Sequence, residues 1–150
     1  MNNIYFATED TKYRVRNKKL LRNWLNKAVF AERTINILFV NFIICSDEKI
    51  LYINNKYLNH NYHTDIITFQ YSEPNFPIEA DIYIGIDTVK LNAQQYGVYL
   101  EQELHRVMVH GILHTLGYND KTDREKAIMH SKEDAYLEIL SKMAPRGTIK

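Results

Sequence analysis

Apolar residues occupy every second position over Ile78–Ile86, and this alternation is the strongest structural signal in the chain. Successive side chains of a strand leave opposite faces, so this segment predicts a strand with one buried face. Thr64–Tyr71 has the same period, and the connection 72–77 contains Pro74 and Pro77 and is short enough for a hairpin. The chain is therefore expected to contain a β-sheet built partly from these two strands.

The remaining segments mix two further strands with five helices in no regular order. Residues 4–6 and Thr34–Cys45 are predicted strands, and the second is expected to be largely buried because it is rich in Ile, Phe and Val. This mixture predicts an α+β fold: a single domain over residues 1–150, in which helices pack on a small mixed sheet. The expected helices are 17–32, 46–59, 87–97, 99–116 and 122–143, with Asn17, Ser46, Asp87 and Thr122 as N-caps and Gly117 as the stop signal of the fourth.

Composition narrows the class of protein further. The chain has 150 residues and one cysteine, Cys45, so we expect one domain without an internal disulfide. No signal-like or membrane-spanning apolar segment is visible, so we expect a cytoplasmic protein with no membrane partner. The net charge of +1 gives no general attraction to nucleic acid. An early basic cluster, which is either a binding patch or a solvated face, comprises Lys12, Arg14, Arg16, Lys18, Lys19, Arg22, Lys27 and Arg33.

Residues 110–120, HGILHTLGYND, carry the clearest functional signal. His110 and His114 are four residues apart on a predicted helix, so their imidazoles leave one face and can bind one metal ion. Gly117 permits a sharp reversal, because it adopts positive φ without steric cost, and the reversal can return Asp120 to the histidines. Two histidines and one aspartate leave a fourth position open for water, which is typical of catalytic zinc. We therefore predict a zincin-like helix and turn in which His110, His114 and Asp120 bind the metal.

Two other interpretations of this segment remain open. A histidine pair with this spacing also occurs on ordinary core helices, although the helix break and the position of Asp120 favour a metal site. A zinc metallopeptidase carries a glutamate general base directly after its first histidine, where this chain has Gly111. Glu103 lies about two turns earlier and is expected to be a surface residue, so a metallopeptidase is only the minor alternative. His105 and His130 are expected to be structural.

Three segments, in matching order and spacing, resemble the YbeY family of bacterial ribosomal-RNA maturation factors. HGILHTLGYND is similar to the family pattern H-G-x-L-H-L-x-G-Y-D-H. Asn54, Tyr57 and residues 64–69, TDIITF, fall on N-x-x-Y-R-x5-T-D-V-L-S-F. Residues 80–84, ADIYI, are similar to a strand that begins G-D-I-x-I. The resemblance carried by these motifs covers about residues 54–120.

This resemblance implies a zinc-dependent endoribonuclease that cleaves single-stranded RNA, with roles in 16S 3′-end maturation and ribosome quality control. It implies one Zn²⁺ per chain and metal-assisted phosphodiester hydrolysis. The implied partners are rRNA and the small ribosomal subunit, together with an Era-type GTPase and a small-subunit ribosomal protein. Thr64, Asp65 and Thr68 are expected to line the cleft; the alternative is an ordinary strand start in which Asp65 bonds to the backbone.

Two departures from the family pattern affect these expectations. Asp120 replaces the third histidine, and its negative charge lowers the effective charge of the ion, which favours harder ions such as manganese as alternatives to zinc. Leu58 replaces an arginine and removes a guanidinium that could hold a phosphate. Lys56, His60, His63 and the basic cluster are the candidate substitutes. The missing arginine keeps a second interpretation open, namely a ribosome-assembly factor whose metal is mainly structural.

Overall fold

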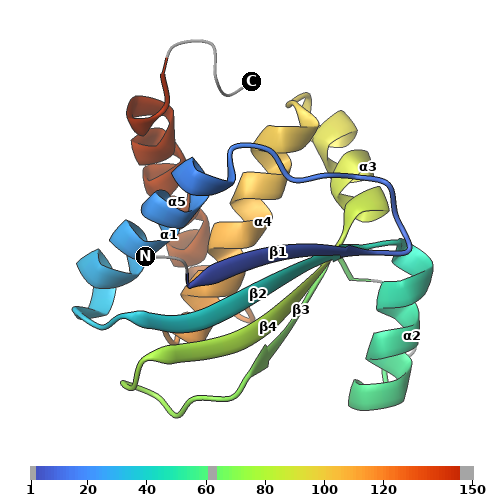
Figure 1. Cartoon of the computed structure of the whole chain (residues 1–150), viewed down its shortest axis with the longest axis horizontal. Helices are drawn as coiled ribbons and strands as arrows, with labels where there is room; N and C mark the ends of the chain where they lie inside the picture. Colours follow the sequence, from blue (N-terminus) through green and yellow to red (C-terminus); the bar gives the residue numbers. More distant parts are fainter. Residues whose placement is uncertain (1–2, 61–63, 146–150) are drawn as a thin grey trace.

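A four-stranded mixed sheet supports the helices in the computed structural model, which describes residues 3–60 and 64–145 (Figure 1). Its spatial order is β1-β2-β4-β3, and the strands are β1 (Ile4–Glu9), β2 (Ile37–Cys45), β3 (Ile66–Gln70) and β4 (Ile78–Gly85). β1, β2 and β4 are parallel, and β3 pairs antiparallel with β4 at one edge. The predicted α+β class, mixed sheet and hairpin are confirmed, whereas β1 extends beyond the predicted residues 4–6.

Five helices within the described residues cover this sheet: α1 (Lys18–Arg33), α2 (Asp47–Leu58), α3 (Ile86–Tyr96), α4 (Leu100–Thr115) and α5 (Asp123–Met143). α1, α4 and α5 lie on one side of the sheet, above the strands in Figure 1, with α4 between α3 and α5. Their apolar faces meet the sheet in one core, where Trp24, Phe42, Ile82 and Leu104 are almost fully buried. A smaller apolar cluster joins α2 to the other face. None of these helices has both the length and the apolar character needed to cross a bilayer.

The helix caps agree with the sequence at two positions and differ at two others. Ser46 and Thr122 are confirmed N-caps, because each side chain accepts a hydrogen bond from the backbone N–H three residues later. Asn17 precedes α1 in the left-handed conformation, with φ of 59°, and its side chain makes no capping hydrogen bond. Asp87 lies inside the first turn of α3 and accepts a hydrogen bond from the Asp47 N–H instead. A tertiary contact between α2 and α3 therefore replaces the predicted local cap.

His105 is a core residue of α4, as expected for a structural histidine. It is 2% exposed, and its ring meets that of Trp24 edge-on at a centroid separation of 6.2 Å. Burial disfavours the charged imidazolium and lowers the pKa of His105 from its usual 6.5 to about 4. The folded protein therefore keeps this ring neutral over a pH range in which the unfolded chain protonates it.

We predict that this difference makes the fold acid-sensitive. Above pH 6.5 both states hold a neutral His105, and as the pH falls toward 4 the unfolded state alone gains the proton. The free energy of unfolding should therefore drop by about 2 kcal/mol between pH 7 and pH 5 because of this residue. Urea unfolding of the wild type and of His105→Leu at both pH values tests this, with the exposed His130→Leu as control. An equal drop in His105→Leu would contradict the assignment.

Candidate metal centre

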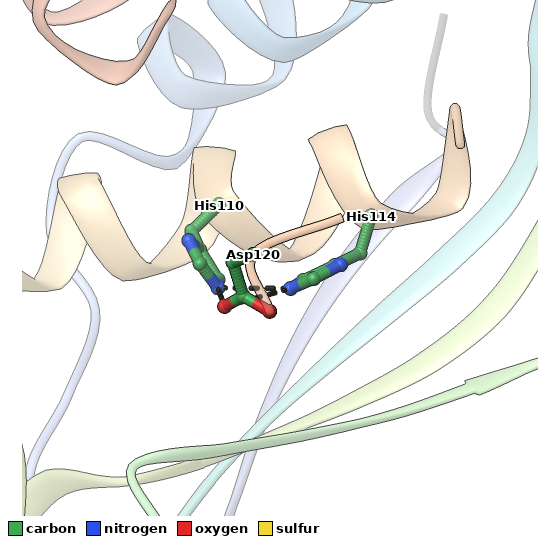
Figure 2. A group of neighbouring side chains, drawn as sticks. All are labelled: His110, His114 and Asp120. Atoms are coloured by element: carbon green, nitrogen blue, oxygen red, sulfur yellow. Dashed lines mark hydrogen bonds and ion pairs between the residues drawn. The ribbon is translucent and has the colours of Figure 1, made fainter. Parts of the chain in front are cut away.

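Helix α4 and the turn that follows it bring the three predicted ligands together (Figure 2). His110 and His114 project from one face of the helix, which ends at Thr115. Gly117 then adopts φ of 99°, the left-handed conformation predicted for it, and its N–H donates to the His114 carbonyl at 3.0 Å. The chain reverses there, so that the Asp120 carboxylate faces both imidazoles.

The spacing of the three donor atoms fits a single tetrahedral ion. The two Nε2 atoms of His110 and His114 are 3.0 Å apart. The Asp120 Oδ2 atom lies 3.3 Å from the first and 3.4 Å from the second. Ligand atoms about 2.05 Å from a tetrahedral ion are separated by about 3.3 Å from each other. The cluster therefore has the donor set and the dimensions of a site that could hold a divalent cation, although the donor set alone does not select the metal.

Glu133 on α5 is a part of this centre that sequence reasoning missed. Its Oε2 atom lies 2.5 Å from His110 Nδ1, and its Oε1 atom accepts a hydrogen bond from Arg106 at 3.0 Å. The Glu133 side chain is only 7% exposed. A carboxylate on Nδ1 keeps the proton on that nitrogen and leaves the Nε2 lone pair directed at Asp120 and His114. Its position ten residues into the next helix gave no sequence signal for this contact.

The charges around His110 are mostly negative. Burial lowers the pKa of this imidazole, but the hydrogen bond that it donates to Glu133 and the negative charges of Glu133, Asp120 and Asp65 outweigh burial, so the pKa is raised. Asp65 is itself affected, because burial raises the pKa of its carboxyl group while His110 opposes the shift. A cation at this position would therefore enter a site whose carboxylates already favour positive charge.

The packing at Gly111 bears on the peptidase interpretation. A Cβ atom at this position would lie 2.8 Å from the Ile66 side chain and 3.3 Å from the Ile82 side chain. A side chain beside His110 would therefore require the Ile66 and Ile82 side chains to shift. Gly111 also supplies no carboxylate at the position where a zinc peptidase carries its general base.

The other predicted site residues lie in different environments. Asp65 lines a cavity that reaches His110 and Asp120, whereas Thr64 and Thr68 are not among the residues that line it. The Thr64 hydroxyl group instead donates to the Ile66 backbone carbonyl at 3.2 Å. Glu103 lines the same cavity and is 5% exposed, so its prediction as a surface residue was wrong. α3 and α5 enclose this side of α4, which no local pattern revealed.

Three of the candidate substitutes for the missing arginine already donate hydrogen bonds within the protein. Leu58 ends α2 and is 39% exposed, and Lys56 donates a hydrogen bond to the Tyr52 hydroxyl group. His63 lies outside the described residues. Two arginines of the basic cluster have structural contacts, since Arg22 donates to the Ile4 carbonyl and Arg33 donates to the Leu116 carbonyl.

Fold and cluster together define a small α+β domain in which a helical His-x3-His motif and a following aspartate form a potential metal site. A family model described as "Endoribonuclease YbeY" matches residues 3–141. The chain belongs to the YbeY family.

Similar proteins cover nearly the whole chain. A Cytophaga hutchinsonii protein named "Endoribonuclease YbeY" is 49% identical over 136 residues, which are 91% of this chain and 94% of the relative. An Amoebophilus asiaticus protein of the same name is 42% identical over 135 residues, or 90% and 91% of the two chains. The solution structure of a Thermotoga maritima protein aligns with a TM-score of 0.62 at 28% identity and covers 93% of this chain and 89% of that one.

We predict that Glu133 contributes to metal affinity without being a ligand. Glu133→Ala should weaken Zn²⁺ or Co²⁺ binding by about 10- to 100-fold, because His110 loses the acceptor that fixes its tautomer and orientation. Glu133→Gln keeps an acceptor oxygen and should have a smaller effect. Competition titrations against a chromophoric chelator would measure the affinities. Asp134→Asn is the matched control, since Asp134 binds Arg106 at 2.6 Å but does not touch His110. Equal losses in Glu133→Ala and Asp134→Asn would argue against this role.

Proposed function

We propose that this protein is a metal-dependent endoribonuclease with zinc bound by His110, His114 and Asp120. The observation that supports this most strongly is the convergence of their donor atoms at separations of 3.0–3.4 Å. The names of the curated relatives supply the reaction, since they are called endoribonucleases. Gly111 speaks against peptidase chemistry at the same centre.

In this proposal the side chains of the protein hold the metal ion, orient its ligands and line the space for the substrate. His110 and His114 provide two neutral nitrogen ligands, and Asp120 provides one anionic oxygen ligand. A divalent cation held there supplies Lewis acidity, which polarises a phosphoryl oxygen and acidifies the attacking water. Glu133 keeps the His110 proton on Nδ1, on the side away from the ligands. Asp65 lines the adjoining cavity, where it can accept a proton from an approaching water or hydroxyl group.

We further propose that the RNA is single-stranded ribosomal RNA, acted on in 16S 3′-end maturation and in ribosome quality control. The small ribosomal subunit, one of its proteins and an Era-type GTPase would be the partners, in the cytoplasm. Support comes from the motif resemblance over about residues 54–120 and from membership of the YbeY family. Manganese or another hard divalent ion is the alternative to zinc, because one ligand is a carboxylate.

The direct test combines metal content with RNA cleavage. His114→Ala and Asp120→Ala should lose most bound metal by elemental analysis, and both should lose cleavage of an unstructured RNA by at least about 100-fold, because each removes a ligand. Asp123→Asn is the control, since this nearby acid begins α5 and is not part of the cluster. Cleavage that persists in both ligand variants would show that the activity comes from a contaminant or from another site.

Leu58 at the position of the family arginine supports one competing function, a ribosome-binding factor with a structural metal. The two functions predict different results when the metal is removed. The ligand side chains of His110, His114 and Asp120 are 21%, 30% and 40% exposed and lie outside the apolar core. We therefore expect a chelator to abolish cleavage and to change the melting temperature by only a few degrees. Loss of the folded state on chelation, followed by circular dichroism, would favour the structural metal.

A further inference from the structure

A cavity of about 590 Å³ adjoins the metal centre and is not explained by metal binding alone. It lies among α3, α4, α5 and the start of β3, and His110 and Asp120 are among the residues that line it. Two of the three clustered residues thus border a space that is large enough for a nucleotide. Residues of α3 and of the first half of α4 line it as well.

Glu103 is the unusual residue of this cavity. It lies on the same face of α4 as Val107 and His110, at positions i, i+4 and i+7, and all three residues line the cavity. The residue is 5% exposed, and within residues 3–60 and 64–145 no group donates a hydrogen bond to this carboxylate. Burial raises its pKa, Arg106 opposes the shift, and Asp65 and Glu133 add to it. Among the described residues Glu101 Oε1 is the fully buried side-chain atom without a partner, whereas the Glu103 side chain lines the cavity, where a bound molecule can supply N–H or O–H donors.

The rest of the cavity wall suits a nucleotide. Tyr96 is 64% exposed at the rim and offers an aromatic face for stacking. Val107 and Met129 are buried apolar wall residues. Lys126 and His130 are exposed on the α5 side of the rim, where their positive charge or N–H groups can contact a phosphate.

We propose that this cavity binds one nucleobase of the RNA next to the cleaved phosphodiester, and that Glu103 selects guanine. The proposal rests on the endoribonuclease function proposed above. Guanine presents two neighbouring donors, N1–H and the exocyclic amino group, which match the two oxygens of one carboxylate. Adenine and cytosine place a ring acceptor beside their amino group, and uracil flanks its single N–H with two carbonyl oxygens. Of the four bases, only guanine can donate two neighbouring hydrogen bonds to the ionised Glu103 carboxylate.

The test measures binding separately from cleavage. The zinc-loaded full-length protein is titrated with the 5′-monophosphates GMP, AMP, CMP and UMP by calorimetry. We expect GMP to bind at least about tenfold more tightly than UMP, which is about 1.4 kcal/mol. Glu103→Gln replaces an acceptor oxygen by an N–H₂ donor and should remove this preference, while phosphate contacts keep some affinity for all four nucleotides.

Glu101→Gln is the matched control, because Glu101 is also a buried glutamate of α4 but faces Arg16 at 4.0 Å and does not line the cavity. It should keep the wild-type preference for GMP. Melting temperatures of both variants show whether either fails to fold, and Glu103→Asp, which retains the carboxylate, then provides a second test with partial preference expected.

The outcomes separate this proposal from the proposed function. Cleavage of RNA with equal affinity for all four nucleotides, or a GMP preference that survives in Glu103→Gln, would overturn the guanine subsite and leave the nuclease intact. A Glu103-dependent GMP preference without any RNA cleavage would support the subsite and contradict the nuclease. A second metal ion per chain that is lost in Glu103→Gln would overturn the subsite, since a cation would then satisfy the carboxylate.

Discussion

The burial of α4 is the constraint on which the rest of this structure depends. The helix packs against the sheet, α1, α3 and α5, so each of its polar side chains must be neutral, paired or turned toward a cavity. His105 stays neutral against Trp24. Arg106 is paired with two acids of α5, and His110 is paired with Glu133. His110 and His114 thus lie toward the end of a helix on which most polar groups are neutral or paired, while Glu101 Oε1 is buried without a hydrogen-bond partner.

The position of Asp120 depends on contacts far from the cluster itself. The turn after α4 is tied to the rest of the molecule through Tyr118, whose hydroxyl group donates to Glu32 at 2.5 Å. The same carboxylate accepts hydrogen bonds from Tyr136 and from Lys132 on α5. Burial raises the pKa of Glu32, but these three donors outweigh it and hold the pKa below its usual value. One ionised residue of α1 therefore joins the turn to α5 and limits the movement of Asp120.

The sequence predicted the parts of this molecule that depend on local periodicity. The i, i+4 spacing of His110 and His114 and the glycine turn after them are properties of one continuous segment, and so is the alternation in β4. Glu133 and Glu103 were missed or misplaced because their environment is tertiary. The first is recognised only when α5 packs on α4, and the second becomes buried only when α3 and α5 enclose that flank. Asp87 failed as a cap for the same reason.

The carboxyl groups around the candidate metal site affect the binding of a cation and of an RNA phosphate in opposite ways. Asp65, Glu103, Asp120 and Glu133 place four carboxyl groups around one cavity, and this arrangement repels a phosphate in the absence of a cation. Leu58, at the end of α2, stands where the family pattern has an arginine, so this chain lacks that positive charge. A divalent ion bound by His110, His114 and Asp120 would offset two of these negative charges. In the proposed RNA complex the remaining carboxyl groups would favour the N–H-rich edge of a base over a second phosphate.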